Sequence, residues 1–568
     1  MAAPRFLPDM GRSRVATVTS KRSQGLVKRL AGLAFELTPQ VFAVACFVVG
    51  ASILASAATP AFAHRLAVLD RALHPLLIDL SHFGASVAGF LLLALSAGLW
   101  RRRRGAYWAT LIVLIGAAAL SLLKGLDWEE ALELGAVAVL LAPCRAAFNR
   151  RSVLTEPLHP AWLLRVGAAV AAIVWLGFFV YRDVTYQDEL WWTFLTDREV
   201  SGFLRAAAVL AGLTVLVAGR SLLSAPGLRG RRCAAPEEVA RAIEILRAGG
   251  GRAEPEAWLA ALGDKALMFS PSGRSFLTYR VIGRRWIAMG EPAGAVEERR
   301  ELLWAFAEAA DGYGAAPVFY SVGEGLLADL ATLGLAVRKI GETAAVDTAA
   351  FSLEGKARQN LRTAVNRAER EGAVFEMLPP GAASAVAAEL KAVSDAWLTA
   401  HRGTEKAFSL GRFDPAYLDL MPLAVVRASG RIVAFANLMP GGRPADGLAV
   451  DLMRHAPDAP PGVMDYLFVR AIQWARDQGW AFLDLGLAPL AGLDDRRLSP
   501  VFARVGALVF DEGEAVYGFS GLRAYKAKFA PDWRPRFIAA PPSTPLALAL
   551  LDVALLTSGG WRGMLRGG

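Results

Sequence analysis

Six long apolar segments in the first 223 residues constrain the fold of this chain more than any other feature. Each is nearly free of charged residues in its interior and long enough to cross the roughly 30 Å hydrocarbon layer of a bilayer as a helix. We therefore predict a multi-span α-helical membrane domain over residues 38–223. The six segments are Thr38–Ala58, Phe83–Trp100, Ala106–Leu123, Ala131–Phe148, Ala161–Tyr181 and Phe203–Leu223.

The connections between these segments alternate in charge. The N-terminal tail 1–37 and the stretches 101–104, 145–151 and 220–232 are strongly basic, whereas 124–130 and 182–199 carry mostly Asp and Glu. Because basic loops stay on the cytoplasmic side, both ends of the membrane domain are expected in the cytoplasm. Everything after Leu223 is therefore predicted to be cytoplasmic.

The composition fits a protein that touches an anionic surface. The formal net charge is +10 although 54% of the residues are hydrophobic, which favours contact with anionic lipid, nucleic acid or both. The cysteines Cys46, Cys144 and Cys233 are isolated, so neither a disulfide framework nor a cysteine zinc site is indicated. No HExxH motif is present, and no metal site is expected.

The cytoplasmic half changes to short strand signals alternating with helices. After a linker and helix over 224–254, residues 255–350 predict one α/β module, and no GxxxxGK[ST] or GxGxxG phosphate loop occurs in it. In residues 351–545, three strand signals precede a helix over 464–478 and a strand over 482–486. This order is typical of an acetyltransferase-like fold, so we expect two tandem acetyltransferase-like (GNAT-like) modules.

The usual acyl-CoA loop of that fold is missing from the second module. The helix at 464–478 is preceded by Pro460, Pro461 and Gly462 instead of a basic residue and spaced glycines, which disfavours a CoA donor. The C-terminal tail 546–568 contains an apolar run that is too short to span a membrane. We expect this run to pack on the domain.

An acid and a base follow each other closely in the stretch VDLMRHAPDAPPGVMD. Asp451 is expected to end a strand and Arg454 to follow in the loop, a placement suited to holding a zwitterionic or amine-bearing substrate. On these residues alone, a surface ion pair beside a turn is the favoured interpretation.

Basic residues line one face of the predicted helix Lys356–Glu371. Arg358, Arg362, Asn366 and Arg370 recur at every fourth position and therefore share that face. The stripe predicts either contact with the phosphates of nucleic acid or lipid, or a solvated surface.

Six ordered motifs between Pro255 and Ala540 closely resemble the aminoacyl-phosphatidylglycerol synthases, the multiple peptide resistance proteins that include phosphatidylglycerol lysyltransferase. The motifs are SPSGRSFLTYRVIGRRWIAMGEPAG, NLRTAVNRAEREG, FSLGRFD, VDLMRHAPDAPPGVMDYLF, LGLAPL and GLRAYKAKFAPDWRPRF. Full-length members carry a longer membrane region that moves the product lipid outward, so this chain resembles the synthase part.

The resemblance implies a reaction. Family members transfer an amino acid, usually lysine and sometimes alanine, from aminoacyl-tRNA to a hydroxyl of phosphatidylglycerol, which makes the lipid cationic and weakens binding of cationic antimicrobial peptides. No cofactor is implied, because the tRNA ester is already activated. Asp451 and Arg454 would line the aminoacyl site, and Lys526 would supply a cation for the oxyanion or the lipid phosphate.

Further candidates have weaker roles under the resemblance. Glu405, Asp465 and Asp484 are candidates for holding a lysyl side chain, and Tyr525 and Lys528 for lining the substrate site. Contact with tRNA or the lipid headgroup is expected from Arg358, Arg362, Arg367 and Arg523.

Three other functions remain open at this point. The first is an alanyl- instead of a lysyl-phosphatidylglycerol synthase. The second is a lipid flippase or transporter with a regulatory cytoplasmic domain, and the third is a transferase that acts on peptidoglycan precursors. The resemblance to the aminoacyl-phosphatidylglycerol synthases implies a protein of the bacterial cytoplasmic membrane whose partners are aminoacyl-tRNA and phosphatidylglycerol. The sequence does not reveal the oligomeric state.

Overall fold

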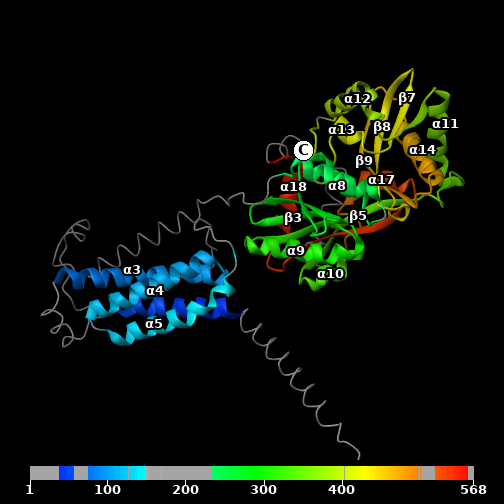
Figure 1. Cartoon of the computed structure of the whole chain (residues 1–568). Coiled ribbons are helices and arrows are strands. Elements are labelled where there is room, and N and C mark those ends of the chain that lie inside the picture. The colour runs from blue at the N-terminus through cyan, green and yellow to red at the C-terminus, as the bar shows by residue number, and fades with distance from the viewer. Residues whose placement is uncertain are drawn as a thin grey trace, which may run out of the picture. The chain divides into compact units, whose positions relative to one another are not determined.

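The computed structural model divides into two units, a helical unit before residue 228 and an α/β unit after it (Figure 1). The structure describes residues 37–56, 75–125, 127–148, 233–249, 251–401, 403–494 and 519–560, together with a few single positions. The predicted spans 161–181 and 203–223 lie outside these residues, apart from one helical position at 168.

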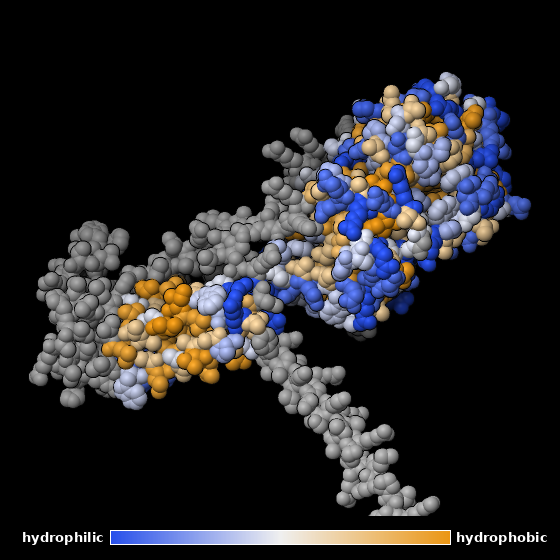
Figure 2. Space-filling view, in the orientation of Figure 1, coloured by the Kyte–Doolittle hydropathy of each residue, from blue (hydrophilic) through white to orange (hydrophobic). Residues whose placement is uncertain are grey.

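The helical unit contains elongated apolar helices. Its described elements are a helix over Leu37–Ser56, α3 (Pro75–Trp100), α4 (Arg104–Gly125), α5 (Trp128–Leu141) and the short η1 (Ala142–Ala147). Their visible surface is mostly hydrophobic, whereas the α/β unit mixes hydrophilic and hydrophobic residues (Figure 2). An apolar exterior is expected of helices that face lipid.

Two of the described helices, Leu37–Ser56 and Arg104–Leu122, are long and apolar enough to cross a membrane. The apolar part of α3, Gly84–Trp100, is shorter than these two helices and falls below the length of a membrane-crossing helix. The span predicted at 131–148 is wrong in its length, because α5 stops at Leu141 and continues only as a tight 3-10 turn containing Pro143. The multi-span domain as a whole therefore stays a prediction.

The described strands of the α/β unit form one sheet of eleven, in the order β1-β2-β3-β4-β11-β5-β10-β9-β8-β7-β6. The first half of the unit contains α8 (Pro236–Ala248), η3 (Pro255–Leu262), β1 (Ala266–Phe269), β2 (Ser275–Ile282), β3 (Arg285–Gly294), η4 (Val296–Glu298), α9 (Arg299–Gly312), β4 (Ala316–Val322), η5 (Glu324–Leu326), α10 (Leu327–Thr332) and β5 (Ala336–Asp347).

The second half repeats the pattern of the first. It contains η6 (Lys356–Arg358), α11 (Gln359–Arg370), β6 (Val374–Leu378), η7 (Ala383–Val386), α12 (Ala387–Ala400), α13 (Pro415–Leu418), β7 (Leu423–Ala428), β8 (Arg431–Pro440), η8 (Pro444–Asp446), β9 (Leu448–His455), α14 (Val463–Asp477), β10 (Phe482–Pro489), α17 (Phe519–Ala527), β11 (Asp532–Ala540) and α18 (Leu546–Thr557).

Each half has the predicted acetyltransferase-like order. Three antiparallel strands lead into a helix that returns to a parallel strand: β3 pairs parallel to β4 across α9, and β9 pairs parallel to β10 across α14. The halves then exchange their last strands. β11 lies between β4 and β5 of the first half, and β5 lies between β11 and β10 of the second.

The two faces of the sheet have different cores. On one face, α8, η3, α12, α13 and α18 cover both halves and share a single cluster that includes Trp258, Phe435 and Ile538; we call this the shared-core face. On the opposite face, α9 and α10 cover the first half and α11 and α14 cover the second, each with a cluster of its own.

The apolar run near the C-terminus packs on the domain, as predicted. Ala549, Val553 and Leu555 of α18 are buried, and Asp552 forms an ion pair with Arg285 of β3. The terminal helix α18 therefore packs in the shared core and is linked by an ion pair to the first half of the sheet.

The strand exchange makes a specific prediction about stability. Ile538 of β11 is fully buried in the shared core, so Ile538→Ala should lower the free energy of unfolding by about 2–5 kcal/mol. In urea titrations of the chain in detergent, followed by tryptophan fluorescence, both halves should unfold together at the lower midpoint.

Val374→Ala provides the control, because Val374 on the edge strand β6 is 60% exposed and should change stability little. Separate transitions for the two halves in Ile538→Ala would contradict a shared core.

Candidate active site

The candidate acid and base lie inside a strand, not at its end. Asp451 and Arg454 both belong to β9, so the prediction that the strand ends at Asp451 was wrong by four residues. In a regular strand, residues three apart point to opposite faces. The two side chains would then be separated by the sheet.

A β-bulge in β9 removes this conflict. Leu438 of β8 pairs with Val450, and Ala436 pairs with Met453, so two β9 residues, Asp451 and Leu452, stand opposite the single Asn437. The extra residue resets the alternation, which is a recurrent use of bulges beside active sites. Asp451 and Arg454 consequently both face the shared core, where their partners come from α12, α13 and the loop between them.

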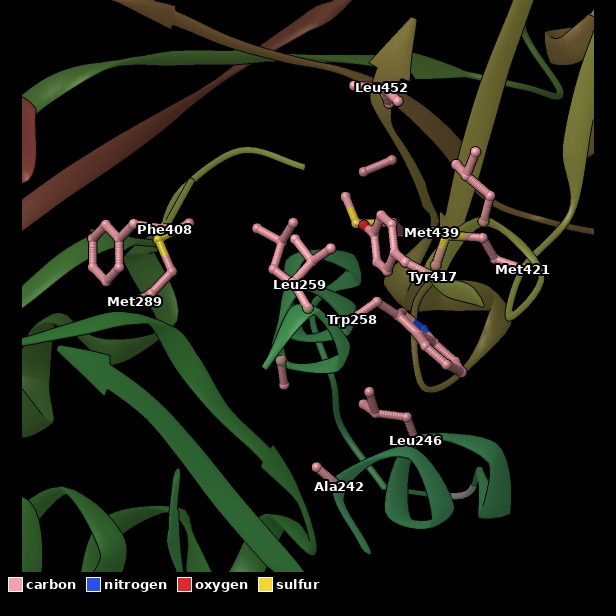
Figure 3. Packing of buried hydrophobic residues seen from close by; sticks show 14 of the residues in the cluster. Ala242, Leu246, Trp258, Leu259, Met289, Phe408, Tyr417, Met421, Met439 and Leu452 are labelled. Carbon is pink, nitrogen blue, oxygen red and sulfur yellow. Dashed lines mark hydrogen bonds between the residues drawn. The ribbon is translucent and has the colours of Figure 1, made fainter. Parts of the chain in front are cut away.

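Asp451 is held by a loop from the FSLGRFD motif. Its carboxylate accepts hydrogen bonds from the Gly411 backbone N–H at 2.7 Å and from the Tyr417 hydroxyl at 2.8 Å. Tyr417 is fully buried, and its hydroxyl lies 3.4 Å from the Met439 sulfur. Trp258 and Leu259 of η3 belong to the same cluster (Figure 3). Burial raises the pKa of Asp451. Burial also raises the pKa of Tyr417, and the charge of Asp451 and its hydrogen bond add to that shift.

Arg454 is buried, with 4% of its surface exposed, and is fully engaged by side chains. Its guanidinium donates two hydrogen bonds to Glu405 at 2.7 and 2.9 Å and a third to the Ser394 hydroxyl. It also lies over the Trp397 ring at 5.5 Å. Glu405, a candidate for a lysyl side chain, is thus in contact with Arg454.

Lys526 belongs to the helix α17 and places its ammonium against β10, the strand beside β9. Its Nζ donates to the carbonyl oxygens of Gly486 at 2.9 Å and Leu487 at 3.0 Å, where a bulge interrupts the pairing of β10 with β5. Lys526 is 4% exposed, and burial lowers its pKa to about 8 although Asp484 opposes the shift.

The parallel pairing of β9 with β10 is short. It contains only Leu448 with Leu483 and Ala449 with Asp484. Asp451 and Arg454 follow this pairing in β9, and the carbonyls that hold Lys526 follow it in β10. The three candidate residues are therefore attached to neighbouring strands beyond the point where the strands stop pairing.

The other predicted residues lie in two separate regions. Asp484 is buried on the shared-core face, where its carboxylate accepts from the Gly486 N–H. On the opposite face, Lys528 approaches Asp465 at 3.3 Å and lies over the Tyr525 ring at 4.5 Å. Asp465 and Lys528 therefore contact each other beside α14, away from the Asp451 carboxylate.

The arginines predicted to contact tRNA or the lipid headgroup mostly bind other groups of the protein itself. Arg358 donates to the carbonyls of Lys528 and Phe529, and Arg362 to those of Leu353 and Gly355. On the surface of α11, Arg367 pairs with Glu371 at 2.7 Å. Farther along the chain, Arg523 lies 3.4 Å from Glu342 and over the Trp533 ring.

Sequence reasoning missed the groups that hold the acid and the base: Gly411, Tyr417, Asn437, Ser394 and Trp397. The sequence did contain one indication for Gly411. It is a glycine in the FSLGRFD motif at a place where no turn evidently requires one. A Cβ there would lie 1.9 Å from the Asp451 carboxylate, so only glycine allows this close approach.

Comparison with known proteins adds to this geometry. A family model described as phosphatidylglycerol lysyltransferase, C-terminal, matches residues 246–540, slightly more than half of the chain. The chain belongs to this family. The match contains both halves of the sheet and all three residues of the candidate site.

Members of the family resemble the chain beyond this region. The phosphatidylglycerol lysyltransferase of Bacillus subtilis is 32% identical over 90% of the chain, and that of Staphylococcus haemolyticus is 27% identical over 72%. These matches cover 58% and 48% of the two relatives, so the chain spans about half of their length.

Two solved structures share the fold of the α/β unit. The C-terminal domain of a putative lysylphosphatidylglycerol synthetase from Agrobacterium fabrum is 42% identical, with a TM-score of 0.51, over 58% of the chain and 99% of that domain. L-PGS from Bacillus licheniformis is 34% identical, with a TM-score of 0.50, over 58% of the chain and 98% of its own length.

The contact between Gly411 and Asp451 can be tested directly. Gly411→Ala should displace the loop and lower the free energy of unfolding by about 1–3 kcal/mol, because the added methyl overlaps the carboxylate. The urea midpoint of the chain in detergent measures the change.

Gly403→Ala is the matched control in the same loop, since its Cβ would meet only Leu398 at 3.6 Å. Equal stability of the two variants would show that Asp451 does not hold the loop at Gly411.

Proposed function

We propose that this protein transfers an amino acid from aminoacyl-tRNA to phosphatidylglycerol at the cytoplasmic face of a bacterial membrane. The observation that carries the proposal is that Asp451 and Arg454 lie in β9 and the Lys526 ammonium is held by β10, beyond the end of the β9–β10 pairing, in a chain of the lysyltransferase family. The apolar helices of the first unit support a membrane-bound acceptor, because they would keep the α/β unit beside the lipid.

The reaction is an ester exchange. A glycerol hydroxyl of the lipid attacks the carbonyl carbon that joins the amino acid to the tRNA ribose, and a tetrahedral oxyanion forms. The C–O bond to the ribose then breaks, the new ester remains on the lipid, and the hydroxyl proton ends on the ribose oxygen. Because the donor is already an ester, positioning and oxyanion stabilisation carry most of the rate.

Asp451 supplies the negative charge that this mechanism needs at the α-ammonium of the amino acid. In the free protein, its carboxylate has two hydrogen-bond donors and a pKa raised by burial. A bound ammonium favours the ionised carboxylate and offsets that burial. Arg454 is held by Glu405 and Ser394, so we assign it to orienting the donor at the wall of the site.

Lys526 supplies a cation for the oxyanion. The backbone carbonyls of Gly486 and Leu487 fix its ammonium against β10. Because the ammonium is buried, its charge acts in a low-dielectric setting and stabilises a developing negative charge more than it would in water.

We assign lysine as the donor amino acid, following the lysyltransferases that the chain resembles. A lysylated lipid carries a net positive charge, so the product would reduce the attraction of cationic peptides to the membrane. Alanine is the alternative donor and is distinguished by the same assay.

The central prediction concerns transfer itself. Membranes containing the full chain, incubated with labelled lysyl-tRNA and phosphatidylglycerol, should yield labelled lipid, and RNase added beforehand should abolish the label. Asp451→Asn should reduce the initial rate by at least about a hundredfold, because removing one charged contact in a transition state costs roughly 3 kcal/mol.

Alanyl-tRNA in a parallel reaction identifies the donor. Glu301→Gln, on the exposed surface of α9, is the control for expression and folding. No RNase-sensitive label in lipid from either donor would refute the proposed activity, and undiminished transfer by Asp451→Asn would remove Asp451 from the site.

The role of Lys526 predicts a pH dependence. With a pKa of about 8, the ammonium loses its proton as the pH rises through that value, so the initial transfer rate should fall between about pH 7 and pH 9. Lys526→Arg keeps its charge throughout this range and should flatten the profile, even if its maximum rate is lower.

Rates are corrected for spontaneous hydrolysis of the tRNA ester at each pH, using membranes without the protein. A rate that rises through pH 8 would contradict the assignment and would make Lys526 a proton acceptor.

A further inference from the structure

A polar cavity on the shared-core face is lined by residues of both halves of the α/β unit. It has a volume of about 310 Å³, within the range of small-molecule sites. Its walls come from η3, from β3, from the turn after β4, and from β10 and β11. The acidic residues Glu254, Glu256, Glu291 and Asp484 line it, with Arg252 and Arg536 among its basic residues.

The cavity occupies the place in the first half that corresponds to Asp451 in the second. β3 is the counterpart of β9, since each follows two antiparallel strands and pairs parallel to the strand after the next helix. β3 also bulges just after its parallel pairing ends: Met289 pairs with Thr278 and Ala293 with Phe276, which leaves three residues opposite one. Glu291 lies in that bulge, as Asp451 lies in the bulge of β9.

Glu291 is buried and its carboxylate has no hydrogen-bond donor among the described residues. The residue is 7% exposed, and both of its carboxylate oxygens lack a hydrogen-bond partner. One of them forms a long ion pair with the Arg252 guanidinium, at 3.5 Å. One further oxygen of Glu254 and one of Glu256 are also unpartnered within the described chain. Buried carboxylates without donors are costly, so this arrangement calls for a ligand that donates.

The arginines of the cavity donate hydrogen bonds to only some of these carboxylate oxygens. Arg536 donates to one oxygen of Glu254 at 2.6 Å and lies 3.7 Å from Glu256. Arg534 lies over the Phe482 ring at 3.9 Å. Burial raises the pKa values of Glu256 and Glu291 to about 7, with Glu254 adding to the shift in both.

A glycine forms the part of the wall nearest the two central carboxylates. A Cβ on Gly323 would lie 3.2 Å from a Glu291 oxygen and 3.4 Å from a Glu254 oxygen, so both carboxylates face the same small volume. The Gly323 backbone has a φ of −82°, which any residue adopts. Glycine is therefore needed here for space and not for conformation.

We infer that this cavity binds an alkylammonium group, with Glu291 as its principal acceptor and Glu254 and Glu256 completing the set. A primary ammonium offers three donors, which suits carboxylates converging from η3 and β3. A metal ion fits less well, since no cluster of metal-ligating side chains occurs among the described residues.

Two sources can supply the ammonium. One is the side chain of a lysyl donor, in which case the inference rests on the proposed transfer. Asp484 lines the cavity and pairs with Ala449, two residues before Asp451, which sets the Cα atoms of Asp484 and Asp451 on the order of 8 Å apart by strand spacing. The other source is a free diamine, which would act independently of transfer.

Calorimetric titration of the full chain in detergent tests the cavity with simple probes. The wild type should bind 1,5-diaminopentane, whereas 1,5-pentanediol, its uncharged analogue, should not bind. Glu291→Gln should weaken diamine binding by about tenfold or more, since it removes a charged acceptor. Gly323→Ala should weaken it in the same direction by narrowing the space, and the surface control Glu301→Gln should leave it unchanged.

The probe lysinamide then identifies the source. If the donor side chain is the occupant, Glu291→Gln weakens lysinamide binding and leaves that of norleucinamide unchanged; if a free diamine is the occupant, only diaminopentane responds. Absent diamine binding by the wild type, or equal binding by all four proteins, would overturn the inference. Because these titrations need no tRNA or lipid, their outcome is separate from that of the transfer assay.

Discussion

The exchange of one strand between two similar halves is the constraint on which the rest of the α/β unit depends. β5 and β11 pair along nine registered positions, and each has its other edge on a strand of the opposite half. Neither half can complete its sheet alone, since removing the exchanged strand leaves open edges. The shared core on one face and the position of β11 beside the acidic cavity both follow from this pairing.

Irregularities in the sheet place the polar groups. The bulge in β9 allows Asp451 and Arg454, three residues apart, to face the same side of the sheet, and the bulge in β3 aims Glu291 at a cavity. A third bulge, in β10, frees the carbonyls that hold Lys526. In β9 and β3, a local departure from strand pairing directs an ionisable side chain of the strand, whereas in β10 it provides carbonyls for an ammonium from α17.

Several elements could be predicted from the sequence because they depend on local patterns. The α14 helix begins within one residue of its predicted start, and α11 buries Leu361, Val365 and Ala368 as its periodicity requires. β5 and β11 were missed, since their polar residues obscure any alternation and their partners lie about 190 residues away along the chain. The hydrogen bonds from Arg358 and Arg362 to backbone carbonyls could not be predicted either, because those carbonyls belong to loops without a sequence signal.

The sequence by itself determined the apolar helical character of the first unit, the repeated α/β order of the second, and the family through its ordered motifs. These depend on hydropathy, periodicity and residue identity, which are properties of neighbouring positions. Only the tertiary structure decided that Gly411 and Tyr417 hold Asp451, that Glu405 pairs with Arg454, and that Glu291 is left without a donor. Such contacts join residues far apart in the chain, and they arise from strand exchange and bulges whose energies come from packing the whole sheet.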